Sequence, residues 1–276
     1  MQNLKIFNKI SAIKNFVKEG QKSNKRIALV PTMGSLHEGH LTLINNAKKN
    51  ADIVIVSIFI NKAQFNDLKD YQLYPQNLES DIKMLEKIGV DALFSPSASE
   101  IYDENFSFKI IPTSMIDCLC AKDRVGHFDG VALIITKLFN IVNPDSAFFG
   151  EKDFQQLAII KKLVKDLNFD IEIFGVETVR ESSGLAMSSR NQRLSEASKI
   201  KASMIYKALN EIKINPQIID EKKRELLANG FEKIDYLEIR NEDNLNLNMN
   251  LCSSQKRRIF IAIYIEGVRL IDNLSL

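Results

Sequence analysis

The sequence predicts an α/β fold, with a Rossmann-like, doubly wound parallel sheet followed by a smaller C-terminal α+β domain. Apolar runs of strand length alternate with segments of helical period in the first two thirds of the chain. Those runs are continuous Val, Ile, Leu and Phe, as strands buried on both faces require. After about residue 177, two helical patterns are followed by clustered strands instead. We therefore expect domains at 1–176 and 177–276.

The elements are expected in the following order. An amphipathic helical pattern opens the chain within residues 1–20. Strand-like runs follow at 26–30, 52–60, 91–96, 146–150 and 170–176. Helical patterns alternate with these runs, at 40–50, 77–89, 131–143 and 153–168. Beyond a serine-rich turn, helices are expected at 196–213 and 216–229, and strands at 234–239, 258–265 and 268–274. Parallel strands of this kind bind a ligand beyond their carboxyl ends.

Composition excludes several classes of protein. The chain has 276 residues, and its 37 basic and 35 acidic residues give a formal net charge of +2. That charge is too small to indicate a nucleic-acid or membrane partner, and it favours a small, locally charged ligand. The N-terminus lacks the continuous apolar stretch of a signal peptide, and no apolar run approaches the roughly 20 residues that span a bilayer.

Three cysteines, Cys118, Cys120 and Cys252, form neither a CxxC redox motif nor a zinc spacing. An odd number of cysteines without such a pattern is typical of reduced core residues, so we expect a cytoplasmic protein.

The stretch PTMGSLHEGH, at 31–40, carries the clearest chemical signal. A buried strand that ends in a glycine-containing turn and starts a helix directs backbone N–H groups and the helix dipole at an anion, for which phosphate is the natural candidate. Neither GxGxxG nor GxxxxGK[ST] is present, so a dinucleotide site and a P-loop are not supported. His37 and His40 lie on one face of the first helical turn and can take the place of the P-loop lysine.

Two other interpretations of these histidines compete with the phosphate site. A zinc site is disfavoured, because HEGH lacks the HExxH spacing and a third ligand is not evident. A pair of structural histidines that cap the helix stays open when the motif is taken alone.

Longer stretches carry a resemblance to a known family. HEGH resembles the HxGH signature of the nucleotidyltransferase superfamily, and PTMGSLHEGHLTLI as a whole resembles the N-terminal signature of the pantothenate synthetase (pantoate–β-alanine ligase) family. Further segments that resemble this family lie, in order, at 56–65, 74–81, 126–160 and 177–195. The resemblance covers essentially the full chain.

The resemblance implies ATP-dependent condensation of (R)-pantoate with β-alanine to pantothenate. The reaction would run through a pantoyl adenylate and release pyrophosphate and AMP. The first domain would bind the nucleotide and pantoate, and the second would act as a lid. The resemblance also implies Mg²⁺ bound mainly to phosphate oxygens, and a homodimer. The metal ligands are not implied, and Asp81 is a candidate outer ligand.

Site residues follow from the matching motifs. The residues matched to catalysis are His40, His37 and Lys152. The residues matched to ATP binding are Met33, Gly34, His37, His40, Gly150, Glu151, Lys152, Asp153, Val179, Met187, Ser188, Ser189 and Arg190. The residues matched to pantoate binding are Gln64, Gln156 and Asn61. An amide supplies both a donor and an acceptor, which suits the hydroxyl groups of pantoate.

Three positions depart from the family pattern. Lys62 and Val125 stand where proline is usual, and Asp129 stands where arginine is usual. Two alternatives stay open. One is another nucleotidyltransferase with a phosphorylated substrate, which the neutral Gln64 and Gln156 argue against. The other is a non-catalytic nucleotide-binding protein, supported by the Lys62 and Asp129 departures alone.

Overall fold

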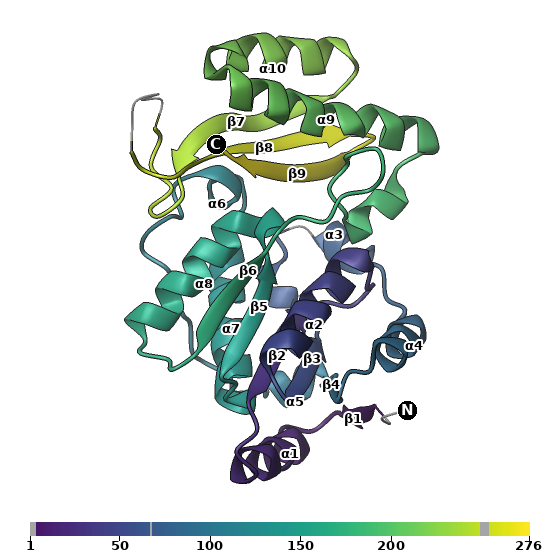
Figure 1. The fold of residues 1–276 in the computed structure, drawn as a ribbon, viewed down its shortest axis with the longest axis vertical. Coiled ribbons are helices and arrows are strands. Elements are labelled where there is room, and N and C mark those ends of the chain that lie inside the picture. Colours follow the sequence, from purple (N-terminus) through teal and green to yellow (C-terminus); the bar gives the residue numbers. More distant parts are fainter. Residues whose placement is uncertain (1–3, 67, 249–253) are drawn as a thin grey trace. The chain divides into compact units, whose positions relative to one another are not determined.

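The computed structural model describes residues 4–66, 68–248 and 254–276. The chain forms two compact units, and each is described by itself (Figure 1). The first unit comprises Met1–Pro112, Arg124–Gly150 and Ile159–Val176. The second unit comprises Thr113–Asp123, Glu151–Ala158 and Glu177–Leu276. Two short segments from the first two thirds of the chain thus pack with its C-terminal part.

The first unit is built on a six-stranded parallel sheet of order β1-β4-β3-β2-β5-β6, which confirms the expected doubly wound fold. The strands are β1 (Lys5–Phe7), β2 (Ile27–Thr32), β3 (Ile53–Ile58), β4 (Ala92–Phe94), β5 (Ser146–Gly150) and β6 (Glu172–Val176). The edge strand β1 was not expected, because it has three residues and no buried apolar run. The helices are α1 (Ile10–Lys22), α2 (Glu38–Asn50), α3 (Leu68–Gln72), α4 (Leu78–Ile88), α5 (Ala98–Ile101) and α7 (His127–Val142). Helix α8 (Phe154–Asp166) begins in the second unit's segment and ends in the first unit.

Helices cover both faces of this sheet. On one face, α2 and α4 bury a cluster that includes Val30, Val56 and Leu85. On the opposite face lies α1, where a Cβ on Gly20 would meet the side chains of Ile53 and Ile27. Because successive side chains of a strand alternate between faces, continuous apolar strands are needed to fill both.

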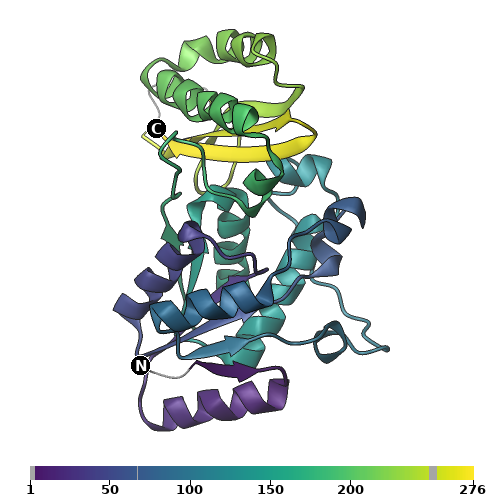
Figure 2. The same cartoon turned by 90° about the vertical axis from the view of Figure 1, so that its right-hand side faces the viewer.

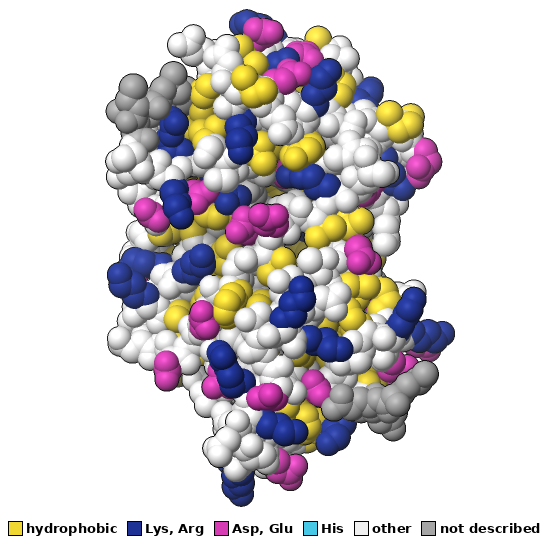
Figure 3. All heavy atoms as spheres, viewed as in Figure 1, with side chains coloured by type: hydrophobic (Ala, Val, Ile, Leu, Met, Phe, Trp, Pro, Cys, Tyr) yellow, Lys and Arg dark blue, Asp and Glu magenta, His cyan; other side chains and the backbone are white. Residues whose placement is uncertain are grey.

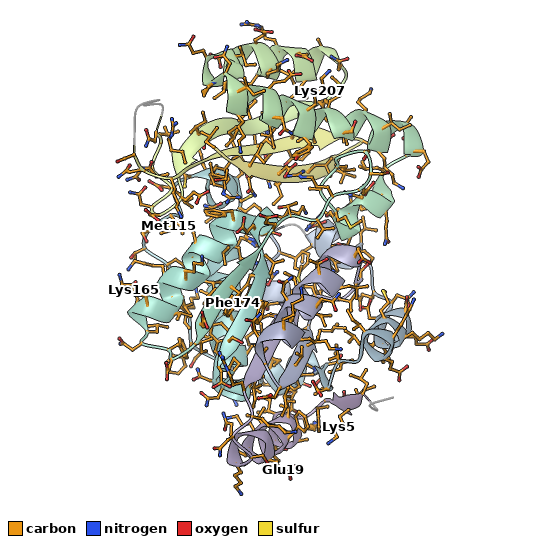
Figure 4. All side chains as sticks on the ribbon, in the orientation of Figure 1. Lys5, Glu19, Met115, Lys165, Phe174 and Lys207 are labelled. Atoms are coloured by element: carbon orange, nitrogen blue, oxygen red, sulfur yellow. The ribbon has the colours of Figure 1, made fainter. Side chains whose placement is uncertain are left out.

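The sheet is reinforced by aromatic stacking. Phe148 of β5 and Phe174 of β6 are direct partners in the parallel register and stack with ring centroids 4.7 Å apart and planes at 6°. Figure 4 labels Phe174 at strand β6. Strand β2 lies between β3 and β5, so the chain order reverses beside it and the loop after β2 opens at the switch point of the sheet.

The second unit carries an antiparallel sheet of order β7-β8-β9, formed by β7 (Lys233–Asn241), β8 (Arg257–Ile265) and β9 (Val268–Ser275). Helices α9 (Glu196–Ile214) and α10 (Ile219–Ala228) pack on one face of it (Figure 2). Ser195 begins α9 as its N-cap, accepting the N–H of Ser198 at 3.2 Å. The α+β expectation is confirmed. The unit also contains α6 (Leu119–Asp123).

Short 3₁₀-helices complete the elements of the described residues: η1 (Lys62–Gln64), η2 (Glu151–Asp153), η3 (Ser189–Arg193) and η4 (Pro216–Ile218). Cys118 and Cys120 are buried free thiols, as expected, whereas Cys252 lies outside the described residues.

On the face shown in Figure 3, basic and acidic side chains are interspersed, in keeping with the small net charge. Across the described part of the chain, no helix has both the length and the apolar character needed to pass through a membrane.

Candidate active site

The predicted phosphate-binding segment runs from the end of β2 into α2. Gly34 and Ser35 both have left-handed backbone, with φ of 80° and 52°. Glycine is required at position 34 on two counts, because a Cβ there would also lie 3.0 Å from both Asp81 Oδ2 and Ile58 Cγ2. This tight turn leads the chain from a buried strand directly to His37, the N-cap of α2.

Asp81 of α4 holds the turn through backbone contacts. Its Oδ2 accepts the N–H of Ser35 and its Oδ1 accepts the N–H of Leu36, each at 2.8 Å, and the residue is 1% exposed. The sequence suggested Asp81 as an outer metal ligand, but the structure gives it backbone partners. This role of Asp81 could not be predicted from a sequence motif, because Ser35 and Asp81 lie 46 residues apart.

His37 and His40 form a reciprocal cap. The N–H of His37 donates to Nδ1 of His40, and the N–H of Gly39 donates to Nδ1 of His37, both at 3.2 Å. The two rings lie 4.1 Å apart between centroids. Because each Nδ1 accepts a backbone N–H, each neutral imidazole carries its own proton on Nε2.

This geometry reconciles the two interpretations of the histidine pair. The imidazoles cap the helix through Nδ1, and each neutral ring keeps an N–H donor on Nε2 in the same helical turn. The helix N-terminus adds its partial positive charge at the same place. One face of the first turn thereby combines backbone and side-chain donors suited to a phosphate group.

Gln64 and Asn61 lie on the turn that follows β3. Asn61 is 1% exposed, and its Nδ2 donates to Gln64 Oε1 at 3.2 Å and to the carbonyl oxygen of Gly130 at 2.9 Å. Tyr102 donates its hydroxyl to Asn61 Oδ1 at 3.0 Å. Gln64 Nε2 in turn reaches Met33 Sδ at 3.0 Å. The structure therefore brings Gln64 to Met33 at the start of the β2–α2 turn, with Asn61 buried beside it.

In the second unit, the GEKD motif forms a turn that is fixed from the C-terminal sheet. Asn273 of β9 donates its Nδ2 to the carbonyl oxygens of Glu151 and Lys152, both at 2.9 Å. Arg258 of β8 donates to Asn273 Oδ1 at 2.6 Å and to Glu151 Oε2 at 3.2 Å. The Glu151 side chain is thus engaged by Arg258, while Gly150 ends β5 in the first unit.

Lys152 and Arg190 lie within electrostatic reach of each other. Burial lowers the pKa of the Lys152 ammonium; the Asp153 and Asp272 carboxylates oppose this shift, and the Arg190 cation acts with the burial. Two neighbouring cations, one of them poorly solvated, are suited to a polyanionic partner. The structure thereby brings together the GEKD motif and the MSSR motif.

The MSSR segment is held by a short antiparallel contact. Met187 donates its N–H to the carbonyl oxygen of Val179 at 2.9 Å, and an isolated bridge joins Arg180 to Ala186. Ser188 caps the turn η3 by accepting the N–H of Arg190 at 3.3 Å. Val179 therefore contacts the MSSR segment through its backbone carbonyl oxygen.

Gln156 is half-buried near the start of α8, and its neighbours Leu157 and Gln155 are buried. Gln155 Nε2 donates to the carbonyl oxygens of Met115 at 2.7 Å and Cys118 at 2.9 Å, and its Oε1 accepts the N–H of Cys120 at 2.9 Å. Sequence reasoning missed Gln155, which fastens the segment before α6 to α8.

The predicted residues thus fall into two groups. Within the first unit the structure brings together Met33, Gly34, His37, His40, Asn61 and Gln64. Within the second unit it places Glu151, Lys152, Asp153, Gln156 and the Val179 and MSSR segments on one body, while Gly150 belongs to the first unit. Three residues that support these groups were not predicted in that role: Asp81, Gln155 and Asn273.

Throughout residues 4–66, 68–248 and 254–276, no group of three or more His, Cys, Asp or Glu side chains is arranged to hold a metal ion. With Asp81 engaged by the backbone, the described part of the chain does not offer a built magnesium site.

Comparisons with known proteins agree over the whole chain. A family model described as pantoate-beta-alanine ligase matches residues 5–275. Two relatives named pantothenate synthetase are 44% identical over 98% of both chains (Caldicellulosiruptor bescii) and 45% identical over 99% of both (Carboxydothermus hydrogenoformans).

Solved structures agree as well. A crystal structure of pantothenate synthetase from Thermus thermophilus matches 99% of both chains with a TM-score of 0.91 and 35% identity. A crystal structure of pantoate-beta-alanine ligase from Francisella tularensis, complexed with beta-gamma ATP and beta-alanine, matches with a TM-score of 0.86 and 38% identity. The match covers 99% of this chain and 98% of the Francisella chain.

Proposed function

The chain belongs to the pantoate-beta-alanine ligase family, and from this premise we propose that it condenses (R)-pantoate with β-alanine to form pantothenate at the expense of ATP. Full-length similarity to pantothenate synthetases supports the overall reaction, and the ATP-complexed Francisella ligase supports ATP as a substrate. The adenylate route, its products and the residue roles below are the finer parts of the proposal.

In the first step, a carboxylate oxygen of pantoate attacks the α-phosphorus of ATP. A new P–O bond forms, the bond from the α-phosphorus to the bridging oxygen breaks, and pyrophosphate leaves. Negative charge moves onto the departing pyrophosphate, so the step needs donors and cations held in place before reaction. It does not need a nucleophilic side chain.

In the second step, the amine of β-alanine attacks the acyl carbon of pantoyl adenylate. The bond between that carbon and the phosphate oxygen breaks, AMP leaves, and the amine gives up a proton. An amide results. Positioning of the two reactants is the protein's main contribution here.

We assign phosphate stabilisation to His40 and His37, which stand in the first turn of α2 with each Nδ1 accepting a backbone N–H. Met33 and Gly34 provide the turn that carries them. Gln64 is assigned to the hydroxyl and carboxylate groups of pantoate, and Gln156 to the same substrate. Asn61, which lies behind Gln64, acts by holding its amide oxygen.

From the second unit, Lys152 and Arg190 are assigned to the triphosphate, because they are neighbouring cations and burial lowers the pKa of Lys152, a shift that a bound anion would oppose. The remaining nucleotide contacts are assigned to Gly150, Glu151, Asp153, Val179, Met187, Ser188 and Ser189. Of these, Glu151 has an ion pair with Arg258 and acts through its backbone in this proposal.

Magnesium belongs to this proposal as part of the nucleotide substrate. Hard oxygen donors of the triphosphate and water suit Mg²⁺, and the described side chains do not build a separate cage for it. A homodimer, and the roles of a nucleotide- and pantoate-binding domain at 1–176 and a lid at 177–276, remain predictions from the family. The cytoplasmic location and the boundary at 177 remain predictions from the sequence.

The observation that carries the proposal is the reciprocal histidine cap at the end of β2. The test is pyrophosphate release by the purified protein with ATP, magnesium and pantoate, with and without β-alanine. We expect release that requires pantoate and turns over repeatedly only when β-alanine is added.

Two other results would redirect the assignment. Pyrophosphate release that needs a phosphorylated substrate in place of pantoate would indicate another nucleotidyltransferase. ATP binding without any release would indicate a non-catalytic nucleotide-binding protein.

A further inference from the structure

We propose that His127 is a positioning residue for pantoate: as a neutral imidazole with its proton on Nδ1, it holds the carbonyl oxygen of Gln64 and so aims the Gln64 side chain. The inference rests on the proposed function, in which Gln64 binds pantoate. It adds a residue that neither the phosphate motifs nor the glutamine motifs contain.

One backbone group of the turn η1, the carbonyl oxygen of Gln64, is held from outside the turn. Within the turn, Gln64 N–H donates to Asn61 O and Phe65 N–H donates to Lys62 O, each at 3.1 Å. The carbonyl oxygen of Gln64 instead lies 2.6 Å from His127 Nδ1 and accepts from Arg124 Nη2 at 3.4 Å. The last residue of η1 is therefore held by the start of α7.

The chemistry of the partners fixes the tautomer of His127. A carbonyl oxygen only accepts, so Nδ1 must carry the proton. Arg124 Nη1 lies 3.0 Å from His127 Nε2 and only donates, so Nε2 must be unprotonated. His127 is 7% exposed. Arg124 thus selects the form of the ring that can hold Gln64.

Backbone packing leaves little freedom at this junction. A Cβ on Gly130 would lie 2.4 Å from the carbonyl oxygen of Ala63 and 2.7 Å from the nitrogen of Gln64. Asn61 also donates to the carbonyl oxygen of Gly130. His127 and Gly130 are three residues apart in α7, so both face η1.

The three departures from the family pattern fall at the same junction. Lys62 opens η1, Val125 precedes the N-cap of α7, and Asp129 lies in the first turn of α7. The carbonyl oxygen of Val125 accepts from Asn66 Nδ2, a second link between the two segments. In this proposal the turn lacks the usual proline, and the side chains of Arg124 and His127 supply the rigidity that aims Gln64.

A spectroscopic test addresses the geometry directly. The chain has three histidines, so ¹⁵N spectra of imidazole-labelled protein can be assigned with single His variants. We expect His127 to be the Nδ1–H tautomer, opposite to the Nε2–H form of His37 and His40. An Nε2–H tautomer or a fully protonated ring at His127 near neutral pH would overturn the proposal.

A kinetic test addresses the role. We expect His127→Ala to raise the pantoate KM roughly 10- to 100-fold, because small misplacement of a binding group is costly, with the ATP KM nearly unchanged. In His127→Asn the amide nitrogen takes the place of Nδ1, so this variant should recover most of the loss. An unchanged pantoate KM in His127→Ala, or an equal rise of the pantoate KM in both variants, would count against a positioning role for His127.

The double variant separates positioning from general damage. If His127 acts through Gln64, His127→Ala should have little further effect on the pantoate KM in a Gln64→Ala background. A full additive effect would overturn the proposal. A wild-type protein that does not act on pantoate would instead overturn the proposed function. The ¹⁵N spectra would then test by themselves whether His127 Nδ1–H holds the carbonyl oxygen of Gln64.

Discussion

The backbone N–H of His37 donates to Nδ1 of His40 at 3.2 Å, so a side chain assigned to phosphate chemistry also closes the first turn of its own helix. In the proposed function, Nδ1 of this ring serves the fold and Nε2 serves the reaction. Substitutions of His40 are therefore expected to change both the stability of the fold and the rate of adenylate formation. A suitable pair of substitutions can separate the two effects.

His40→Ala should lower the single-turnover rate of adenylate formation by a factor of about 10² or more, as expected for loss of a transition-state donor. It should also destabilise the fold by about 1 kcal/mol, because the cap is lost. In His40→Asn, the amide oxygen can still accept from His37, so stability should recover while the rate stays low. A near-normal rate in either variant would remove His40 from the chemistry.

Asp81→Asn should destabilise the protein by about 2 kcal/mol, since an amide accepts at only one of the two positions where the carboxylate holds Ser35 and Leu36. The looser turn should also weaken ATP binding. Urea denaturation and nucleotide titration measure the two effects. Glu79→Gln, an exposed change on the same helix, is the matched control. Equal behaviour of the two variants would contradict the assigned role of Asp81.

Lys152→Met should abolish stabilisation by ATP without destabilising the nucleotide-free protein. Burial lowers the pKa of Lys152 below that of the unfolded chain, so the unfolded state binds more protons between the lowered pKa and 10.5, and stability rises with pH there. Removing the strained cation should remove that rise. Thermal melts with and without ATP across this pH window are the measurement, with Lys161→Met as the exposed control. A large loss of stability without nucleotide would show that Lys152 is structural.

Arg180→Lys should cost about 2 kcal/mol of unfolding free energy although the charge is kept. Arg180 contacts both carboxylate oxygens of Asp272 at 2.6 and 3.0 Å and lies 3.7 Å from the ring centroid of Tyr206. Lysine cannot reproduce the two parallel hydrogen bonds or the stacking. Arg180→Ala should cost more, about 3–5 kcal/mol, because Asp272 is left buried and unpaired. Denaturation curves like those of wild type would refute this account.

The fold could be predicted because its determinants are local and periodic. Continuous apolar runs indicated the strands β2 to β6, and the change to two helices followed by strands indicated the second unit. Strand β1 escaped because Lys5–Phe7 is short and exposed at the sheet edge. The short turns η1 and η2 escaped for the same reason, since one helical turn has no period to detect.

The site could be predicted only as far as motifs reach. His37, His40, Gln64 and Lys152 stand in recognisable strings, but the groups that orient them are distant in sequence. His127 is 63 residues from Gln64, and Asn273 is 121 residues from Lys152. Such contacts depend on which helices, strands and turns the folded chain places next to each other. Only the folded chain contains that information.

The contact of Gln64 with Met33 affects how readily the Gln64 amide can change its hydrogen-bond partner. A thioether is a weak hydrogen-bond acceptor, so the amide of Gln64 loses little when it turns to a ligand hydroxyl. Oxidation of the Met33 sulfur would place a strongly accepting sulfoxide oxygen at the same spot. The amide would then be held by the protein itself, and the same contact that now keeps the site ready would make it sensitive to peroxide.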